Sequence, residues 1–159
     1  MQFGRLLLTA LSLTTAGGTA VADLSRLHAR NPNWPPHARL HAIWNVTHVT
    51  TTQLLALTLL WRGRPEDSRL RARIAAMLIL AFAASFYEAA ILAPAFDAAI
   101  TPDVPAEEMP PRPFGLDGNL FSFLAATPVM LLGWKLCERD RARPSPGAKT
   151  VYASRIGAV

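Results

Sequence analysis

Four long windows that are almost free of charge constrain the fold of this 159-residue chain more than any other feature. Leu6–Ala22, Leu40–Trp61 and Gly118–Trp134 contain no Asp, Glu, Lys or Arg, and Ile74–Phe96 contains only Glu88. A helix needs roughly 20 predominantly apolar residues to cross the hydrocarbon of a bilayer, with about 17 as the lower limit. The sequence therefore predicts an all-α, integral membrane four-helix bundle, with spans at about 5–22, 38–61, 74–96 and 118–137.

Length and composition limit the chain to one domain, since half of its residues are hydrophobic and gathered in these windows. We assign residues 1–137 to the transmembrane domain. Residues 138–159 are basic, contain Pro, Ser and Gly, and have no apolar periodicity. They are predicted to be a disordered cytoplasmic tail.

The first window has two interpretations. Arg5, a short apolar stretch and Ala20-Val21-Ala22 before Asp23 are typical of a secretory signal peptide with its cleavage site. The small residues around Gly17 and Gly18 also suit the packing of a membrane helix. Both interpretations place Asp23 on the outer side of the membrane.

Lysine and arginine are distributed unequally between the segments that join the windows. Arg5, five arginines within 62–73 and six basic residues from 135 to 155 fall on one side, and only Arg26, Arg30, Arg39 and Arg112 on the other. The positive-inside rule then predicts a multi-pass protein of the plasma or inner membrane with both termini in the cytoplasm. Because the basic residues flank the windows without an aromatic platform, the lipid bilayer is the expected partner and nucleic acid is not.

Glu88 points most directly to function. An ionisable group within a membrane span is energetically costly and usually faces a partner, a cavity or a pathway. Glu88 lies eight residues in from Phe96, and His48 lies eight residues in from Leu40. At 1.5 Å per residue, both side chains are roughly 12 Å below the outer boundary. The sequence therefore predicts that His48 and Glu88 form a pair.

The second window carries a polar stripe on its outer half. At about 100° per residue, one arc of about 100° holds His37, His41, Trp44, Asn45, His48 and Thr52. We expect this arc to face the bundle, whereas Ile43, Val46 and Leu57 are expected to face lipid.

The predicted pair indicates proton-transfer chemistry, because a carboxyl group beside an imidazole can exchange protons near neutral pH. Glu88 and His48 would be catalytic in an outer-half polar pocket that binds, isomerises or cyclises a small lipophilic molecule. His41, Trp44, Asn45 and Tyr87 would bind the substrate, and the two aromatic rings suit a cationic intermediate. The alternative is a non-catalytic membrane subunit or small transporter, in which His48 and Glu88 hold helices together or relay protons.

A metal site built from His41, His48 and Glu88 is a further alternative, but the His-x6-His spacing is not diagnostic. The sequence has no Gly-rich phosphate loop, nucleophile elbow or cysteine cluster. We therefore expect no metal and no cofactor. The single cysteine, Cys137, excludes an internal disulfide. The sequence leaves the oligomeric state open.

A distinctive block precedes the second window. The run Asn31-Pro-x-Trp-Pro-Pro-His-Ala-Arg-x-His41, followed by Trp44, His48 and Leu59-Leu-Trp-Arg62, resembles a family of small four-span membrane proteins of bacteria and fungi whose function is uncharacterised. The resemblance covers about residues 5–136 and implies no activity. In its predicted use of intramembrane His and Glu, the chain is also faintly similar to the emopamil-binding sterol isomerases. Those proteins use such residues on a lipid substrate but have one more span. That similarity is an analogy.

Overall fold

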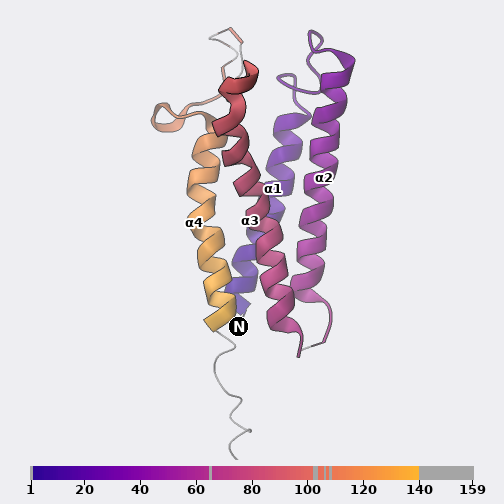
Figure 1. The fold of residues 1–159 in the computed structure, drawn as a ribbon, viewed down its shortest axis with the longest axis vertical. Helices are drawn as coiled ribbons and strands as arrows, with labels where there is room; N and C mark the ends of the chain where they lie inside the picture. The colour runs from indigo at the N-terminus through magenta and orange to yellow at the C-terminus, as the bar shows by residue number, and fades with distance from the viewer. Residues whose placement is uncertain (1, 65, 102–103, 106, 108, 140–159) are drawn as a thin grey trace, which may run out of the picture.

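The computed structural model describes residues 2–64, 66–101, 104–105, 107 and 109–139. These residues form the helices α1 (Gln2–Asp23), α2 (Pro36–Trp61), α3 (Ser68–Leu92) and α4 (Gly118–Arg139), with the short 3-10 helices η1 (Ala93–Phe96) and η3 (Pro113–Gly115) and no strand among them. The four α-helices run side by side in one up-and-down bundle (Figure 1). The prediction of an all-α four-helix bundle is confirmed.

Three helices in the described part of the chain are long and apolar enough to cross a membrane: Phe3–Asp23, Ser68–Phe96 and Gly118–Arg139. α2 is as long as the others but is less apolar, because it contains three histidines, five threonines, Asn45 and Gln53. The sequence prediction counted α2 as a fourth span because residues 40–61 contain no Asp, Glu, Lys or Arg. Of the predicted tail, residues 138 and 139 belong to α4, and the rest lies outside the described residues.

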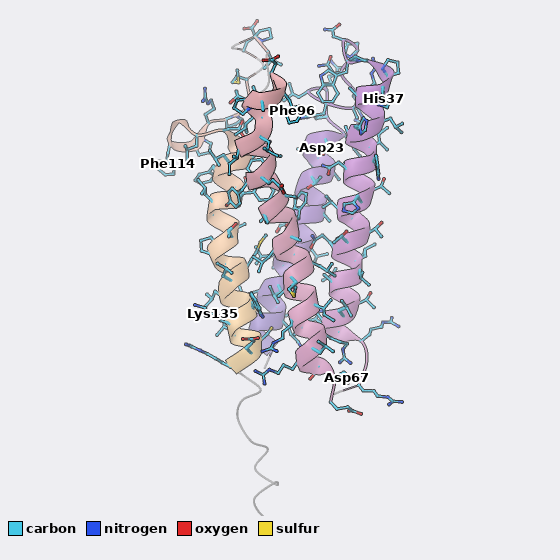
Figure 2. All side chains as sticks on the ribbon, viewed as in Figure 1. Asp23, His37, Asp67, Phe96, Phe114 and Lys135 are labelled. Atoms are coloured by element: carbon cyan, nitrogen blue, oxygen red, sulfur yellow. The ribbon has the colours of Figure 1, made fainter. Side chains whose placement is uncertain are left out.

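Each helix has two main neighbours in the bundle, and α1 and α3 also touch across it. α1 and α3 both pack against α2 and α4, and α1 lies behind α3 in Figure 1. Two loops and the tips of the helices meet at one end, where Figure 2 shows Asp23, His37 and Phe96; we call this the loop end. Asp67 and Lys135 lie at the opposite end, which also holds the arginines of residues 62–73 and which we call the arginine-rich end.

Packing is closest toward the arginine-rich end. The buried hydrophobic core there includes Leu8, Ala56, Leu60, Ala72, Ala75, Ala76, Ile79, Met130 and Cys137. Small side chains allow the backbones to approach, so a Cβ added at Gly4 would lie 2.7 Å from the backbone nitrogen of Cys137 and 2.8 Å from the carbonyl oxygen of Gly133. Two polar contacts join helices at this end: Trp61 donates to Thr9 at 2.8 Å, and Arg73 pairs with Glu138 at 2.7 Å.

The half of the bundle nearer the loop end is packed more openly. Among the described residues from 13 to 23 on α1, 84 to 92 on α3 and 118 to 129 on α4, none is buried. On α2, the only buried residue before Val49 is Ala42. The helices therefore close on one another at the arginine-rich end and leave room between them at the loop end.

Candidate functional site

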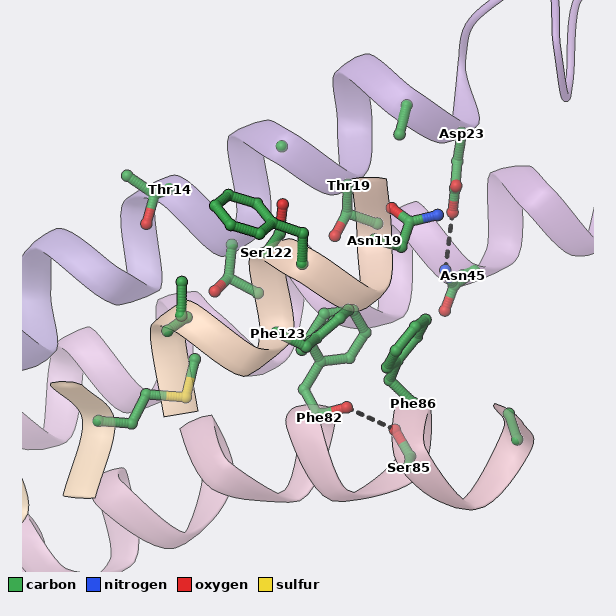
Figure 3. Close-up of a pocket in the computed structure, with 18 residues that line it drawn as sticks. Thr14, Thr19, Asp23, Asn45, Phe82, Ser85, Phe86, Asn119, Ser122 and Phe123 are labelled. Atoms are coloured by element: carbon green, nitrogen blue, oxygen red, sulfur yellow. Dashed lines mark hydrogen bonds between the residues drawn. The ribbon is translucent and has the colours of Figure 1, made fainter. Parts of the chain in front are cut away.

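A cavity of about 780 Å³ occupies this open half, and it is partly open at its side. α1, α3 and α4 provide most of its wall, and α2 contributes Asn45 (Figure 3). Small residues on all three wall helices leave the space unfilled; they are Gly18, Ala22, Ala89, Ala125 and Ala126. The volume falls within the range of small-molecule binding sites, which is about 300–1,000 Å³.

Aromatic rings form one wall of the cavity. Phe86 of α3 stacks on Phe123 of α4 with ring centroids 4.2 Å apart, and Phe82 lies 5.4 Å from Phe123. Next to this cluster, the hydroxyl groups of Tyr87 and Thr127 are hydrogen-bonded at 3.1 Å, which ties α3 to α4. The wall offers a flat apolar surface to a ligand and is held in place by contacts between the two helices.

A polar corner lies at the loop end of the cavity. The side-chain amide of Asn45 donates a hydrogen bond of 2.7 Å to the carboxylate of Asp23, the last residue of α1 (Figure 3). Asp23 is the one ionisable side chain among the described lining residues. Hydroxyl and amide groups of Thr19, Asn119 and Ser122 also line the cavity. The site therefore combines an apolar wall with a carboxylate acceptor at one end.

The loop before α2 holds Asp23 in position. Its backbone folds onto the end of α1, where the amide of Ala29 donates to the carbonyl oxygen of Asp23 at 2.9 Å and the ring of His28 contacts the carbonyl oxygen of Ala22 at 3.0 Å. Arg39 then donates to the carbonyl oxygens of Trp34 at 3.0 Å and Pro32 at 2.8 Å.

Residues of the distinctive sequence block thus make this loop compact. Trp34 packs edge-on against His28, with ring centroids 5.4 Å apart. Pro36 begins α2, where its missing N–H leaves no intrahelical hydrogen bond unmade. The block therefore connects α1 to α2 in a fixed way and sets the position of Asp23 relative to Asn45.

The two residues predicted to be catalytic lie elsewhere. His48 and Glu88 are both exposed, neither lines the cavity, and no hydrogen bond or ion pair joins them. The expected pairing of His48 with Glu88 within one chain is therefore not present. Among the described residues, no group of three or more His, Cys, Asp or Glu side chains is arranged to hold a metal ion.

Only some of the predicted substrate-binding residues lie at the cavity. Asn45 lines the cavity through its contact with Asp23. His41 is exposed on α2, where its ring is 3.0 Å from that of His37 and stacks on Trp44. Tyr87 supports the aromatic wall without lining the cavity. The structure thus brings one of the predicted residues into the site.

The face of α2 that packs against the bundle also differs from the predicted one. The buried residues of α2 are Ala42, Val49, Gln53, Ala56 and Leu60, so the core-facing stripe is rotated by about 100° from the histidine stripe. Ile43 is exposed as expected for a lipid-facing residue, whereas Val46 and Leu57 are half-buried.

Sequence reasoning missed Asp23 and the phenylalanines. Asp23 directly follows an uncharged window, where the sequence indicates only the point at which the chain leaves the membrane. A carboxylate that follows a run of small residues directly was the available signal, but nothing in the sequence shows that Asn45, 22 residues later, reaches it. The phenylalanines at 82, 86 and 123 are indistinguishable by composition from ordinary span residues.

The fold and the cavity define a class: a four-helix bundle with three helices of membrane-spanning length and a cavity between the helices at one end. The chain belongs to DUF6640, a family of unknown function, whose model matches residues 8–144. No curated protein and no solved structure matches the chain.

Proposed function

We propose that this protein is a multi-pass membrane protein in which all four helices cross the bilayer. Three helices have the required length and hydropathy, and α2, with 26 residues, packs alongside α1 and α3. Large apolar side chains such as Leu13, Ile91 and Leu132 are exposed on the outside of the bundle, as a lipid environment favours. The arginine asymmetry supports cytoplasmic termini in a plasma or inner membrane.

The function we propose is the binding of one small lipophilic molecule that carries a hydrogen-bond donor. The observation that supports it is the cavity of about 780 Å³, with its aromatic wall and the Asp23–Asn45 corner. A hydroxyl or amine of the ligand would donate to the Asp23 carboxylate, and its apolar body would lie against Phe86 and Phe123. A few well-placed polar groups in a mainly apolar site are what orient such ligands.

We limit the proposal to binding. The acid–base pair predicted for isomerisation or cyclisation, His48 and Glu88, lies outside the cavity lining, so that pair is not assembled beside a bound substrate. Their exposure on the outer surface instead favours the alternative in which these two residues serve contacts between helices.

Retinol is a suitable probe because it is a fluorescent lipophilic alcohol small enough for the cavity. Purified protein in detergent micelles should bind it saturably, at one molecule per chain. Gly18→Leu should weaken binding by about tenfold or more, since Gly18 lines the cavity and a Cβ added there meets no atom within 4 Å, so the larger side chain can occupy the space.

Gly17→Leu is the matched control. Gly17 precedes Gly18, also has open space around it, and does not line the cavity. Asp23→Ala should reduce the preference for retinol over its methyl ether by about tenfold, because a hydrogen bond to a charged group is lost. Equal binding by the wild type and Gly18→Leu would contradict the proposed site.

A further inference from the structure

Two ionisable side chains lie on the outer surface of the bundle within its membrane-length helices. Glu88 of α3 and His48 of α2 are exposed, and neither makes a hydrogen bond or ion pair within the described part of the chain. On a bundle placed in a bilayer as proposed above, both would face lipid. Such residues almost always pair with another polar group.

Both side chains project from the same side of the molecule. Glu88 follows buried Ile79 by nine residues, which is about half a turn away from the core-facing side of α3. On α2, His48 immediately precedes buried Val49, whereas Trp61 immediately follows buried Leu60. One residue before and one residue after a buried position lie on opposite sides of it, so His48 and Trp61 are on opposite flanks of the core-facing stripe.

Trp61 shows which flank of α2 lies beside α1 and which lies beside α3. It donates to Thr9 of α1, and α2 lies between α1 and α3, so the flank opposite Trp61, which carries His48, is the one beside α3. Asn45 lies about 60° nearer the core than His48, and from there it reaches Asp23 at the end of α1 where both line the cavity. Glu88 points directly away from the core-facing side of α3, so both side chains project outward from the part of the bundle that α2 and α3 form.

The two groups also lie at nearly the same depth. Figure 2 shows Phe96 and His37 at the same end of the bundle. At 1.5 Å per residue, Glu88 is about 12 Å below Phe96 and His48 is about 16 Å below His37. This difference is within the reach of the two side chains.

We propose that this face binds a second copy of the chain, with Glu88 of each copy bonded to His48 of the other. A two-fold axis normal to the membrane keeps every residue at its own depth and sets α3 of one copy against α2 of its partner. In such an interface every contact occurs twice, once in each direction. One acidic and one basic group per copy therefore form two pairs between the copies.

The surface around Glu88 permits close approach. Ala81 and Ala84 precede it by seven and four residues on the same exposed face of α3. Small residues at this spacing let membrane helices pack closely. The charge complementarity of Glu88 and His48 is the reason to identify the partner as a second copy.

The test is energy transfer between donor- and acceptor-labelled copies of the full chain in phosphatidylcholine vesicles, over a range of protein-to-lipid ratios. The wild type should form dimers. Glu88→Leu and His48→Leu should each raise the dimer dissociation constant by about tenfold or more, because each substitution removes both reciprocal pairs. Thr47→Leu, at an exposed neighbour on a different face of α2, should leave it unchanged.

A charge exchange sharpens the test. His48→Glu alone sets carboxyl groups opposite one another and should prevent dimerisation, whereas the double variant His48→Glu/Glu88→His restores both pairs and should restore the dimer. Helix content by circular dichroism confirms that each variant folds. A wild type that stays monomeric at every ratio, or leucine variants that dimerise as it does, would overturn the proposal. Since the proposal rests on membrane placement, resistance of the protein to alkaline carbonate extraction is measured separately.

Discussion

Single polar residues on α2 differ in their surroundings even though they share one helix. Gln53 is 1% exposed, and neither atom of its side-chain amide has a hydrogen-bond partner in the described structure. Ser12 of α1 is also fully buried with its hydroxyl unpartnered. His48, five residues before Gln53, is exposed. A buried amide without a partner costs stability, because its interactions with water are lost and not replaced.

We therefore expect Gln53→Leu to stabilise the protein. Leucine is similar in size and removes the unsatisfied amide, so the free energy of unfolding should rise by about 1–3 kcal/mol. Thermal or denaturant unfolding in detergent measures the change. Thr51→Leu, at an exposed position on the same helix, should change stability by less than about 0.5 kcal/mol. Loss of stability in Gln53→Leu would mean that the amide has a partner.

The histidines and Glu88 also mark the limit of sequence reasoning at this scale. Helical periodicity correctly groups residues onto a face, but it does not say which way the face points. On α2 the core direction follows the small and apolar series through Ala42, Val49 and Ala56, because close packing there decides the rotation. Asn45 lies between that series and the histidine stripe, and it was found for that reason.

At the scale of helices, the backbones of α1 and α4 approach each other closely. It depends on Gly4, where a Cβ would meet two backbone atoms of α4 within 2.8 Å. Backbone atoms cannot move aside as the end of a flexible side chain can. The two helices can therefore keep their separation only while residue 4 has no side chain.

Gly4→Ala should destabilise the bundle by about 1–3 kcal/mol, the usual effect of overpacking a filled site. Gly17→Ala on the same helix is the control: no atom lies within 4 Å of its added Cβ. It should be neutral or stabilising by up to about 1 kcal/mol, because alanine favours a helix more than glycine does. Both are measured by thermal unfolding. Equal melting temperatures would exclude a close α1–α4 contact at residue 4.

At the scale of the elements, the prediction from sequence was largely sufficient. Each uncharged window contains a helix, because few other conformations are available to a long apolar run bounded by Pro, Gly or charged residues. The exact ends were less predictable: α4 continues to Arg139, and Pro94 belongs to the 3-10 turn η1 rather than to α3. The openness of one half of the bundle could not be foreseen, since it depends on how four helices diverge.

For the whole molecule, the proposed topology is tested by cysteine labelling in a Cys137→Ala background. Asn33→Cys and Phe114→Cys, both exposed at the loop end, should react with a membrane-impermeant maleimide applied to intact cells. Glu66→Cys, exposed in the arginine-rich loop, should react only after the membrane is permeabilised. The reverse pattern would invert the orientation.

The uneven packing of the bundle has a consequence for how such a protein can change over evolutionary time. The contacts that hold the four helices together are concentrated toward the arginine-rich end, whereas the cavity is enclosed by residues of which only Met130 is buried. Substitutions in the cavity wall therefore remove few stabilising contacts. Descendants of this chain can therefore vary the lining of the cavity in one half, while purifying selection on the fold acts mainly on the other.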